Sequence, residues 1–186
     1  MASENKGKKV AIVGSGLVGK SWAMIFASVG YNVTMFDIEP AQVAKALANI
    51  GDELDQFEKD GVLRGTLKAA EQKPLITGSS DLAECVKVSS VLNWKKGYHK
   101  YSHLFLHQDA VYIQECVPEI LDLKRKVWNN IDSVVTNPNT IMASSSSCIV
   151  PSKISNDLKH KDQFIIAHPV SRKKIKHKNW GAFEYI

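Results

Sequence analysis

Two kinds of apolar pattern alternate along the chain and predict its secondary structure. Short runs rich in β-branched residues predict buried strands at residues 9–13, 32–36, 75–77, 110–116, 140–143 and 164–167. Apolar residues spaced three or four apart predict helices over residues 18–29, 40–57 and 120–134, with shorter helical pieces at 66–72, at 81–86 and from Pro151. Strands that alternate with helices predict an α/β fold, a doubly wound and mostly parallel sheet with helices on both faces.

A glycine pattern lies between the first predicted strand and the first long helix. Gly14, Gly16 and Gly19 have the G-x-G-x-x-G spacing. The first glycine permits a tight turn, the second lets a diphosphate approach the backbone, and the third lets the helix pack closely on the strand. Asp37 ends the second strand about 20 positions later, as a dinucleotide site requires. Its carboxylate accepts hydrogen bonds from a ribose 2′-hydroxyl and repels a 2′-phosphate, so the pattern predicts a Rossmann-type domain that binds NAD rather than NADP.

Further polar groups follow the later strands, where ligands bind in such sheets. Glu119 follows the fourth strand, the serines at 144–147 follow the fifth, and His168 follows the sixth. A histidine in this place can act as a general base toward a hydroxyl, with a serine fixing the substrate oxygen. The alternatives stay open: Glu119 as an acid favoured at a helix N-terminus, the serines as a loop, and His168 as a structural residue.

Length and composition restrict the class of protein. The 186 residues suffice for one domain, and 44% hydrophobic with 23% charged residues is typical of a globular chain. No apolar run reaches the roughly 18–20 residues of a membrane span, and the polar N-terminus lacks the features of a signal peptide. Three cysteines without CxxC spacing favour reduced thiols and a cytoplasmic protein without a metal site.

The net charge of +5 comes mainly from two basic stretches, residues 87–108 and 171–178. Such stretches can bind nucleic acid or an anionic membrane, but most are solvated or disordered. No helix-turn-helix, zinc-knuckle or aromatic RNA-binding pattern accompanies them. We therefore expect neither a nucleic-acid nor a membrane partner.

Four segments in order resemble the N-terminal domain of the 3-hydroxyacyl-CoA dehydrogenase family. They are residues 13–24, 113–119, 144–148 and 167–170, and the likeness extends over about residues 8–86 and 109–170. The resemblance implies NAD-linked oxidation of a small 3-hydroxy acid, such as L-gulonate, to the 3-oxo acid. Members of the family are homodimeric, but the domain that forms the dimer is missing from this sequence, so the resemblance leaves the oligomeric state open.

The resemblance assigns roles to individual residues. Ser147 matches the serine that hydrogen-bonds the substrate oxygen, and His168 matches the catalytic base. Positions that contact the cofactor in the family are matched by Leu17, Val18, Asp37 and, near the nicotinamide end, Glu119 and Lys124. No metal ligand is implied.

The chain departs from the family pattern in two places. Residues 87–108 are extra, enter before the fourth strand at the edge opposite the ligand, and are predicted to form a protruding loop that leaves the NAD crevice open. A segment without selected function and a partner-binding insertion are both consistent with them. From residue 171 the chain continues as a divergent basic tail to residue 186, after a NAD-binding domain at 1–170.

The second departure affects the expected activity. The family places a glutamate twelve positions after the histidine, where this chain has Trp180, and Glu184 is out of register. The family's C-terminal helical domain, which closes the cleft, supplies a substrate-binding asparagine and forms most of the dimer contact, does not follow in this sequence. Two hypotheses remain: an NAD-dependent 3-hydroxyacid dehydrogenase, and a dinucleotide-binding module with little or no turnover.

Overall fold

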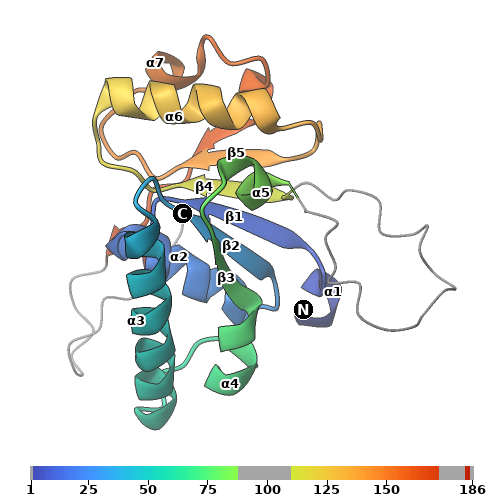
Figure 1. Cartoon of the computed structure of the whole chain (residues 1–186), viewed down its shortest axis with the longest axis vertical. Coiled ribbons are helices and arrows are strands. Elements are labelled where there is room, and N and C mark those ends of the chain that lie inside the picture. The colour runs from blue at the N-terminus through green and yellow to red at the C-terminus, as the bar shows by residue number, and fades with distance from the viewer. Residues whose placement is uncertain (1, 88–109, 172–182, 185–186) are drawn as a thin grey trace, which may run out of the picture.

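The computed structural model describes residues 2–87, 110–171 and 183–184 (Figure 1). Its centre is a six-stranded sheet in the order β3-β2-β1-β4-β5-β6, in which all neighbouring strands are parallel. The strands are β1 (Lys9–Val13), β2 (Asn32–Phe36), β3 (Ile76–Ser79), β4 (Tyr112–Glu115), β5 (Ile141–Ser144) and β6 (Phe164–Ile166). The predicted α/β fold with a doubly wound, Rossmann-type sheet is confirmed.

Helices connect these strands close to where the apolar spacing predicts them, and one short helix that was not predicted precedes β1. They are α1 (Ala2–Asn5), α2 (Leu17–Ser28), α3 (Pro40–Lys59), α4 (Ala69–Gln72), α5 (Leu82–Val86), α6 (Leu121–Val134) and α7 (Pro151–Ser155), with 3₁₀ turns η1 (Lys73–Leu75) and η2 (Lys161–Gln163). Asp81 begins α5 by accepting the amides of Ala83 at 2.7 Å and Glu84 at 3.2 Å. The strand predicted at 75–77 begins one residue later, because Pro74 and Leu75 belong to the 3₁₀ turn.

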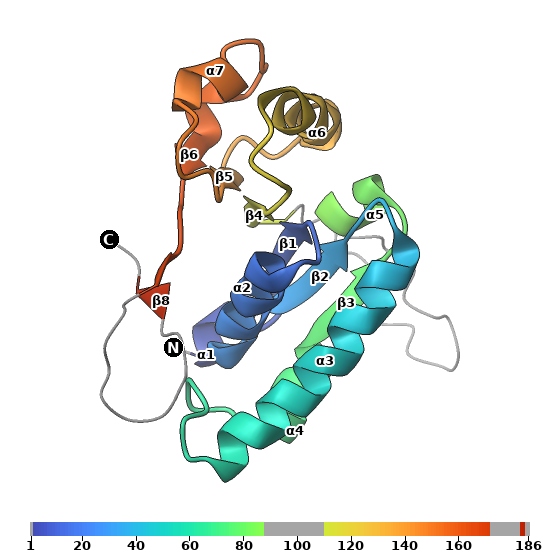
Figure 2. The ribbon, with the colours of Figure 1, turned by 90° about the vertical axis from the view of Figure 1, so that its left-hand side faces the viewer.

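Helices cover both faces of the sheet (Figure 2), and alternate residues of the central strand supply the two halves of the core. Val10 and Ile12 point toward α2 and α3, while Ala11 and Val13 point toward α5, α6 and α7. All four are essentially inaccessible to water. A strand covered on both faces needs such a continuous apolar run, and the helices on either side bury it.

Two segments discussed above, residues 87–108 and the basic tail, lie mostly outside the described residues. The amide of Ala110 donates to the carbonyl of Val86 at 2.9 Å, so the two ends of the segment between them are joined at the amino end of the sheet. The loop expected over residues 87–108 lies, beyond Lys87, outside the described residues, as does Trp180.

The backbone pairs once more after the sheet ends. β7 (Val170–Ser171) and β8 (Phe183–Glu184) form an antiparallel pair with Val170 opposite Glu184. Part of the basic tail therefore returns to the segment that follows His168. Within the residues described, no helix has the length and apolar character needed to cross a bilayer.

Candidate functional site

The candidate residues gather at the carboxyl edge of the sheet, around the point where the strand order reverses between β1 and β4. Asp37 follows β2, Glu119 follows β4, Ser147 follows β5 and His168 follows β6. Doubly wound sheets bind their ligands in this crevice, because chain segments diverge from it in opposite directions. These groups therefore lie at the edge of the sheet where the sequence predicts the site.

Two of the three motif glycines are required by the packing of the chain itself. Gly14 has φ +105°, and a Cβ there would lie 2.8 Å from the carbonyl carbon of Cys116. A Cβ on Gly19 would lie 1.9 Å from the carbonyl oxygen of Gly14. Gly14 allows the turn to pack against the end of β4, and Gly19 allows α2 to pack against the turn. The fold itself therefore requires these two glycines, and they are not evidence for a ligand.

Gly16 differs, because no contact with the described residues explains it. It caps α2 with φ −66°, a value open to any residue, and a Cβ there would have no atom of the described chain within 4 Å. The first α-helical bond runs from the Lys20 amide to the Gly16 carbonyl at 2.9 Å, so the amides of residues 17–19 precede the helical ladder. An open place before the positive end of a twelve-residue helix fits the diphosphate of a dinucleotide.

Asp37 is held beside this turn by Ser15, a residue that the sequence analysis did not single out. The Ser15 amide and hydroxyl both donate to Asp37 Oδ2 at 2.8 Å. Oδ1 accepts the amide of Glu39 at 3.2 Å. Leu17 and Ile38 are 72% and 82% exposed at the same edge. Large apolar side chains left exposed beside a fixed carboxylate are suited to the flat faces of an adenosine group.

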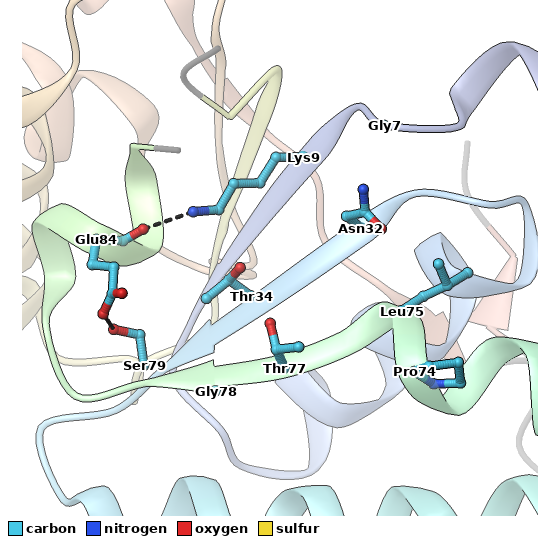
Figure 3. Close-up of a pocket in the computed structure, with 10 residues that line it drawn as sticks. All are labelled: Gly7, Lys9, Asn32, Thr34, Pro74, Leu75, Thr77, Gly78, Ser79 and Glu84. Carbon is cyan, nitrogen blue, oxygen red and sulfur yellow. Dashed lines mark hydrogen bonds between the residues drawn. The ribbon is translucent and has the colours of Figure 1, made fainter. Parts of the chain in front are cut away.

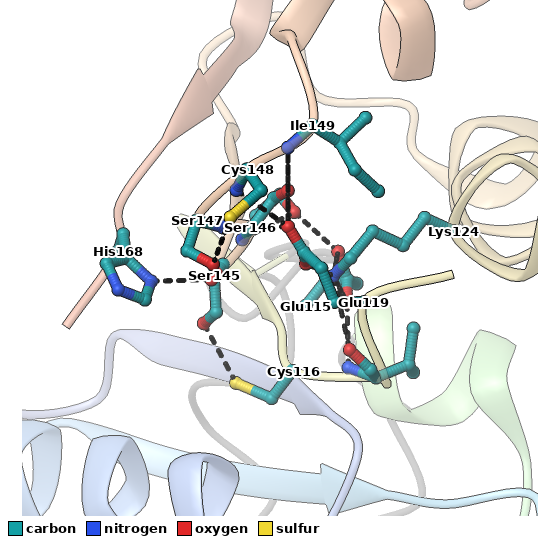
Figure 4. A network of polar contacts seen from close by, with 12 residues as sticks. Glu115, Cys116, Glu119, Lys124, Ser145, Ser146, Ser147, Cys148, Ile149 and His168 are labelled. Atoms are coloured by element: carbon teal, nitrogen blue, oxygen red, sulfur yellow. Dashed lines mark hydrogen bonds and ion pairs between the residues drawn. The ribbon is translucent and has the colours of Figure 1, made fainter. Parts of the chain in front are cut away.

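A buried ion pair lies behind the site and was not predicted (Figure 4). Lys124 Nζ lies 2.8 Å from Glu115 Oε1 and 3.1 Å from Oε2, and the two side chains are 1% and 0% exposed. Glu115 also accepts the Ser144 hydroxyl at 2.6 Å, the Trp128 indole at 3.2 Å and the Val117 amide at 2.7 Å. Every oxygen of this carboxylate is therefore satisfied, as burial of a charge requires.

Lys124 is placed differently from the expected nicotinamide contact. Its ammonium also lies 3.4 Å from Glu119 Oε2, and the enclosed side chain has almost no surface left to offer a cofactor. Glu119 lies nearer the surface, with 34% of its side chain exposed. Lys124 thus connects the buried Glu115 to Glu119, and its contacts are those of a residue that positions Glu119.

Glu119 is bound by the loop that follows β5. Its Oε1 accepts the Ser146 hydroxyl at 2.6 Å and the amides of Ser147 and Cys148, both at 2.9 Å. Burial alone would raise the pKa of Glu119, but these hydrogen bonds and the charge of Lys124 outweigh it and lower the pKa to about 2. Glu119 therefore stays ionised and fixes the loop that carries Ser147.

This lowered pKa gives an expected pH dependence. Because the folded pKa is about 2 and the ordinary value 4.5, Glu119 stabilises the fold fully above pH 4.5, and this contribution disappears as the pH falls toward 2. Urea titrations of the wild type and Glu119→Gln should show the wild type more stable at pH 7, with the difference narrowing below pH 4.5. A difference that stays constant across this range would contradict the assignment.

The four serines after β5 have separate roles. Ser144 donates to Glu115, Ser145 accepts the amide of Gln114 at 2.7 Å, and Ser146 donates to Glu119. Ser147 is exposed, and its Oγ lies 3.4 Å from the thiol sulfur of Cys148. Of this tract, Ser147 is thus the serine whose hydroxyl is available at the surface.

His168 is oriented by a main-chain carbonyl. Its Nδ1 lies 2.9 Å from the carbonyl oxygen of Ser145, next to the loop that carries Ser147 (Figure 4). A carbonyl oxygen can only accept, so Nδ1 carries a proton and the neutral ring has its lone pair on Nε2. The ring is exposed, which leaves Nε2 accessible to a ligand at the carboxyl edge.

A hollow of about 500 Å³ lies elsewhere, on the face of strands β1–β3 (Figure 3). It is lined by hydroxyls, including those of Thr34 and Thr77, and by Lys9. The Lys9 ammonium donates to the carbonyls of Glu84 and Lys87 at 2.6 Å each, so it is bound within the chain. Nothing in this hollow matches the reactive groups at the carboxyl edge. Across the described residues, no three metal-ligating side chains come together.

Comparison with protein families agrees with this geometry. The model described as "3-hydroxyacyl-CoA dehydrogenase, NAD binding domain" matches residues 9–94 and 97–176. The chain belongs to the 3-hydroxyacyl-CoA dehydrogenase family. The matched region contains the glycine turn, Asp37, Glu119, the serines and His168, so the resemblance inferred from the four segments is confirmed.

Lambda-crystallins are among the relatives within the 3-hydroxyacyl-CoA dehydrogenase family. Rabbit (Oryctolagus cuniculus) lambda-crystallin is 46% identical over 171 residues, which are 92% of this chain and 46% of that protein. The human lambda-crystallin homolog is 42% identical over 87% of this chain. L-carnitine dehydrogenase of Oceanobacillus iheyensis is 30% identical over the same share. The chain spans about half the length of these relatives.

Solved structures of the 3-hydroxyacyl-CoA dehydrogenase type have the same fold. The (S)-3-hydroxybutyryl-CoA dehydrogenase of Ralstonia eutropha superimposes with a TM-score of 0.69 at 28% identity, covering 88% of this chain and 49% of that one. A diketoreductase also gives 0.69, at 26% identity and with 88% and 50% covered.

Proposed function

We propose that the chain is the cofactor-binding part of an NAD-dependent dehydrogenase that oxidises a small 3-hydroxy acid, of the L-gulonate type, to the 3-oxo acid. The observation that carries the proposal is the open place at Gly16, which the packing of the chain does not explain and a diphosphate does. The likeness to L-carnitine dehydrogenase, whose name gives a small 3-hydroxy acid as the substrate of that enzyme, supports the choice of a small hydroxy acid over an acyl thioester.

The glycine turn and Asp37 hold the two ends of the adenosine diphosphate portion. Amides at the start of α2, from residue 17 onward, donate to the diphosphate, and Asp37 accepts from the ribose hydroxyls. Ser15 keeps the carboxylate next to the turn through its two 2.8 Å hydrogen bonds. Glu119 borders the nicotinamide end, and Lys124 acts there through Glu119.

His168 and Ser147 act on the substrate hydroxyl. Nε2 of His168 takes the hydroxyl proton while Nδ1 stays bound to the carbonyl of Ser145. The Ser147 hydroxyl donates to the substrate oxygen as its carbon becomes a carbonyl. A bound NAD would supply the acceptor for the hydride that leaves this carbon, so that the substrate would lose two electrons and two hydrogens in all.

Cofactor preference tests the proposal directly. Calorimetric titration should show NADH binding to the chain more tightly than NADPH, because the carboxylate of Asp37 repels a 2′-phosphate. Asp37→Ala should remove that preference by weakening NADH binding. Asp60→Ala, at the far end of α3, is the matched control and should leave both affinities unchanged. Equal affinities in the wild type would argue against the assignment of Asp37.

A second candidate function is a dinucleotide-binding module with little turnover. Its support is the family model, which describes the matched residues 9–94 and 97–176 as an NAD binding domain. Steady-state reduction of NAD with L-gulonate and with 3-hydroxybutyrate separates the two functions. Turnover that falls about 10²–10⁴-fold in His168→Ala supports the dehydrogenase, and no turnover in the wild type supports the module.

A further inference from the structure

A fully buried glutamine lies beneath His168 and takes no part in the proposed chemistry. Gln114, on β4, is 0% exposed. Its Nε2 donates to the Ser145 hydroxyl at 2.7 Å and to the carbonyl of Ala167 at a longer 3.4 Å. Its Oε1 accepts the Tyr112 hydroxyl at 3.0 Å. Because the Ala167 carbonyl can only accept, the amide can face it only with the nitrogen, and the orientation of Gln114 is fixed.

The two groups that Gln114 holds flank the imidazole. Ser145 directly follows β5 and presents its carbonyl to His168 Nδ1 at 2.9 Å. Ala167 directly follows β6 and is the residue before His168. One side-chain amide therefore binds both Ser145, whose carbonyl accepts the hydrogen bond of the imidazole, and Ala167, which directly precedes His168.

The two ionisable neighbours in this network stay protonated. Burial raises the pKa of Tyr112, so its hydroxyl stays protonated and donates to Gln114. Burial also raises the pKa of Cys116 to about 12, so it remains a thiol, 3.3 Å from the Ser145 hydroxyl. The network is thus neutral and satisfied, and such networks hold their members in one arrangement.

We propose that Gln114 is a positioning residue for His168: by clamping Ser145 and Ala167, it holds the Ser145 carbonyl where it keeps the imidazole in the Nδ1–H tautomer with Nε2 free. The inference rests on the proposed function only where it concerns catalysis, because the Nδ1–H tautomer is the one that can accept a substrate proton at Nε2. The tautomer itself can be measured in the absence of substrate, cofactor and turnover.

The test is the tautomer of His168 in the whole chain. Long-range nitrogen–proton correlation spectra of the histidine-labelled protein, at about pH 8.5 where an ordinary imidazole is neutral, report the ratio of Nδ1–H to Nε2–H. His168→Gln identifies the signal among the six histidines. The wild type should show mainly Nδ1–H. Gln114→Met, which keeps the shape but not the amide, should lower the ratio roughly fivefold, the effect of about one net hydrogen bond.

A matched control separates this effect from a general loss of stability. Gln72 is also buried, at 1% exposure, and its amide donates to the carbonyls of Arg64 and Leu67 at 2.9 and 2.8 Å. Gln72→Met should leave the ratio at its wild-type value. An unchanged ratio in Gln114→Met, an equal fall in both variants, or a wild type with mainly Nε2–H would overturn the proposal.

A second variant decides the matter if Gln114→Met does not fold. Ser145→Ala removes the hydroxyl that Gln114 binds but retains the carbonyl that binds His168. We expect the ratio to fall here as well, and an unchanged ratio would overturn the proposal. Absence of dehydrogenase activity would leave these spectra as they are, so failure of the proposed function and failure of the positioning role are distinguishable.

Discussion

Replacing Lys124 by methionine is expected to lower the free energy of unfolding by about 3–5 kcal/mol, because it leaves the carboxylate of Glu115 buried without a counter-charge. Both side chains are essentially inaccessible to water, so no solvent can replace the lost ammonium. Urea titration at pH 7 measures the effect. Such a loss is a large part of the stability of a domain this size, and the variant should be partly unfolded at physiological temperature.

Two further variants show whether the charge is the cause. Lys73→Met breaks the pair with Asp55, whose members are 36% and 49% exposed, and should cost no more than about 1 kcal/mol. Adding Glu115→Gln to Lys124→Met removes the unpaired charge and should recover part of the stability. A loss below about 1 kcal/mol in Lys124→Met, or no recovery in the double variant, would refute this account.

Gly16→Ala is expected to weaken NADH binding by about 10- to 100-fold while leaving the stability of the fold unchanged. The new methyl group has no chain atom within 4 Å, so it enters the place assigned to the diphosphate and keeps the helix amides from it. Hydrogen bonds to a charged group contribute about 1.5–3 kcal/mol, which corresponds to that loss of affinity. Calorimetric titration with NADH, together with urea unfolding, measures both quantities.

Two other glycines provide the controls for this experiment. Gly51→Ala, inside α3, also meets no atom within 4 Å and should stabilise the helix by about 0.5–1 kcal/mol without changing NADH affinity. Gly19→Ala brings a methyl group against the Gly14 carbonyl and should impair folding itself. Unchanged NADH binding in Gly16→Ala would remove the main support for the proposed function.

The fold could be predicted from local pattern because each element contains its own signal. β1 is a continuous apolar run from Val10 to Val13, and α3 begins at a proline and keeps its apolar spacing from Val43 to Phe57. Parallel strands with helical crossovers then leave few possible topologies. The small errors lie at element ends such as Pro74–Leu75, where a 3₁₀ turn and a strand compete for the same residues.

Only those parts of the candidate site that follow from residue type and position in the chain could be predicted. Asp37 and Gly16 follow from spacing, but the role of Ser15 depends on a hydrogen bond across 22 positions. Glu115 falls within a strand segment, and nothing local indicates that Lys124 is its buried partner. The contact that orients His168 comes from a main-chain carbonyl. Because every residue has such a carbonyl, the sequence contains no signal that predicts this contact.

The hydrogen bond from the Ala110 amide to the Val86 carbonyl joins the chain on either side of residues 87–109 at the amino edge of the sheet. Glu119 and the serines lie at the opposite, carboxyl edge, a full strand length away. Lengthening a closed loop costs little, about 0.6 kcal/mol for each doubling. Insertions or deletions between Val86 and Ala110 should therefore be tolerated without disturbing the proposed coenzyme site.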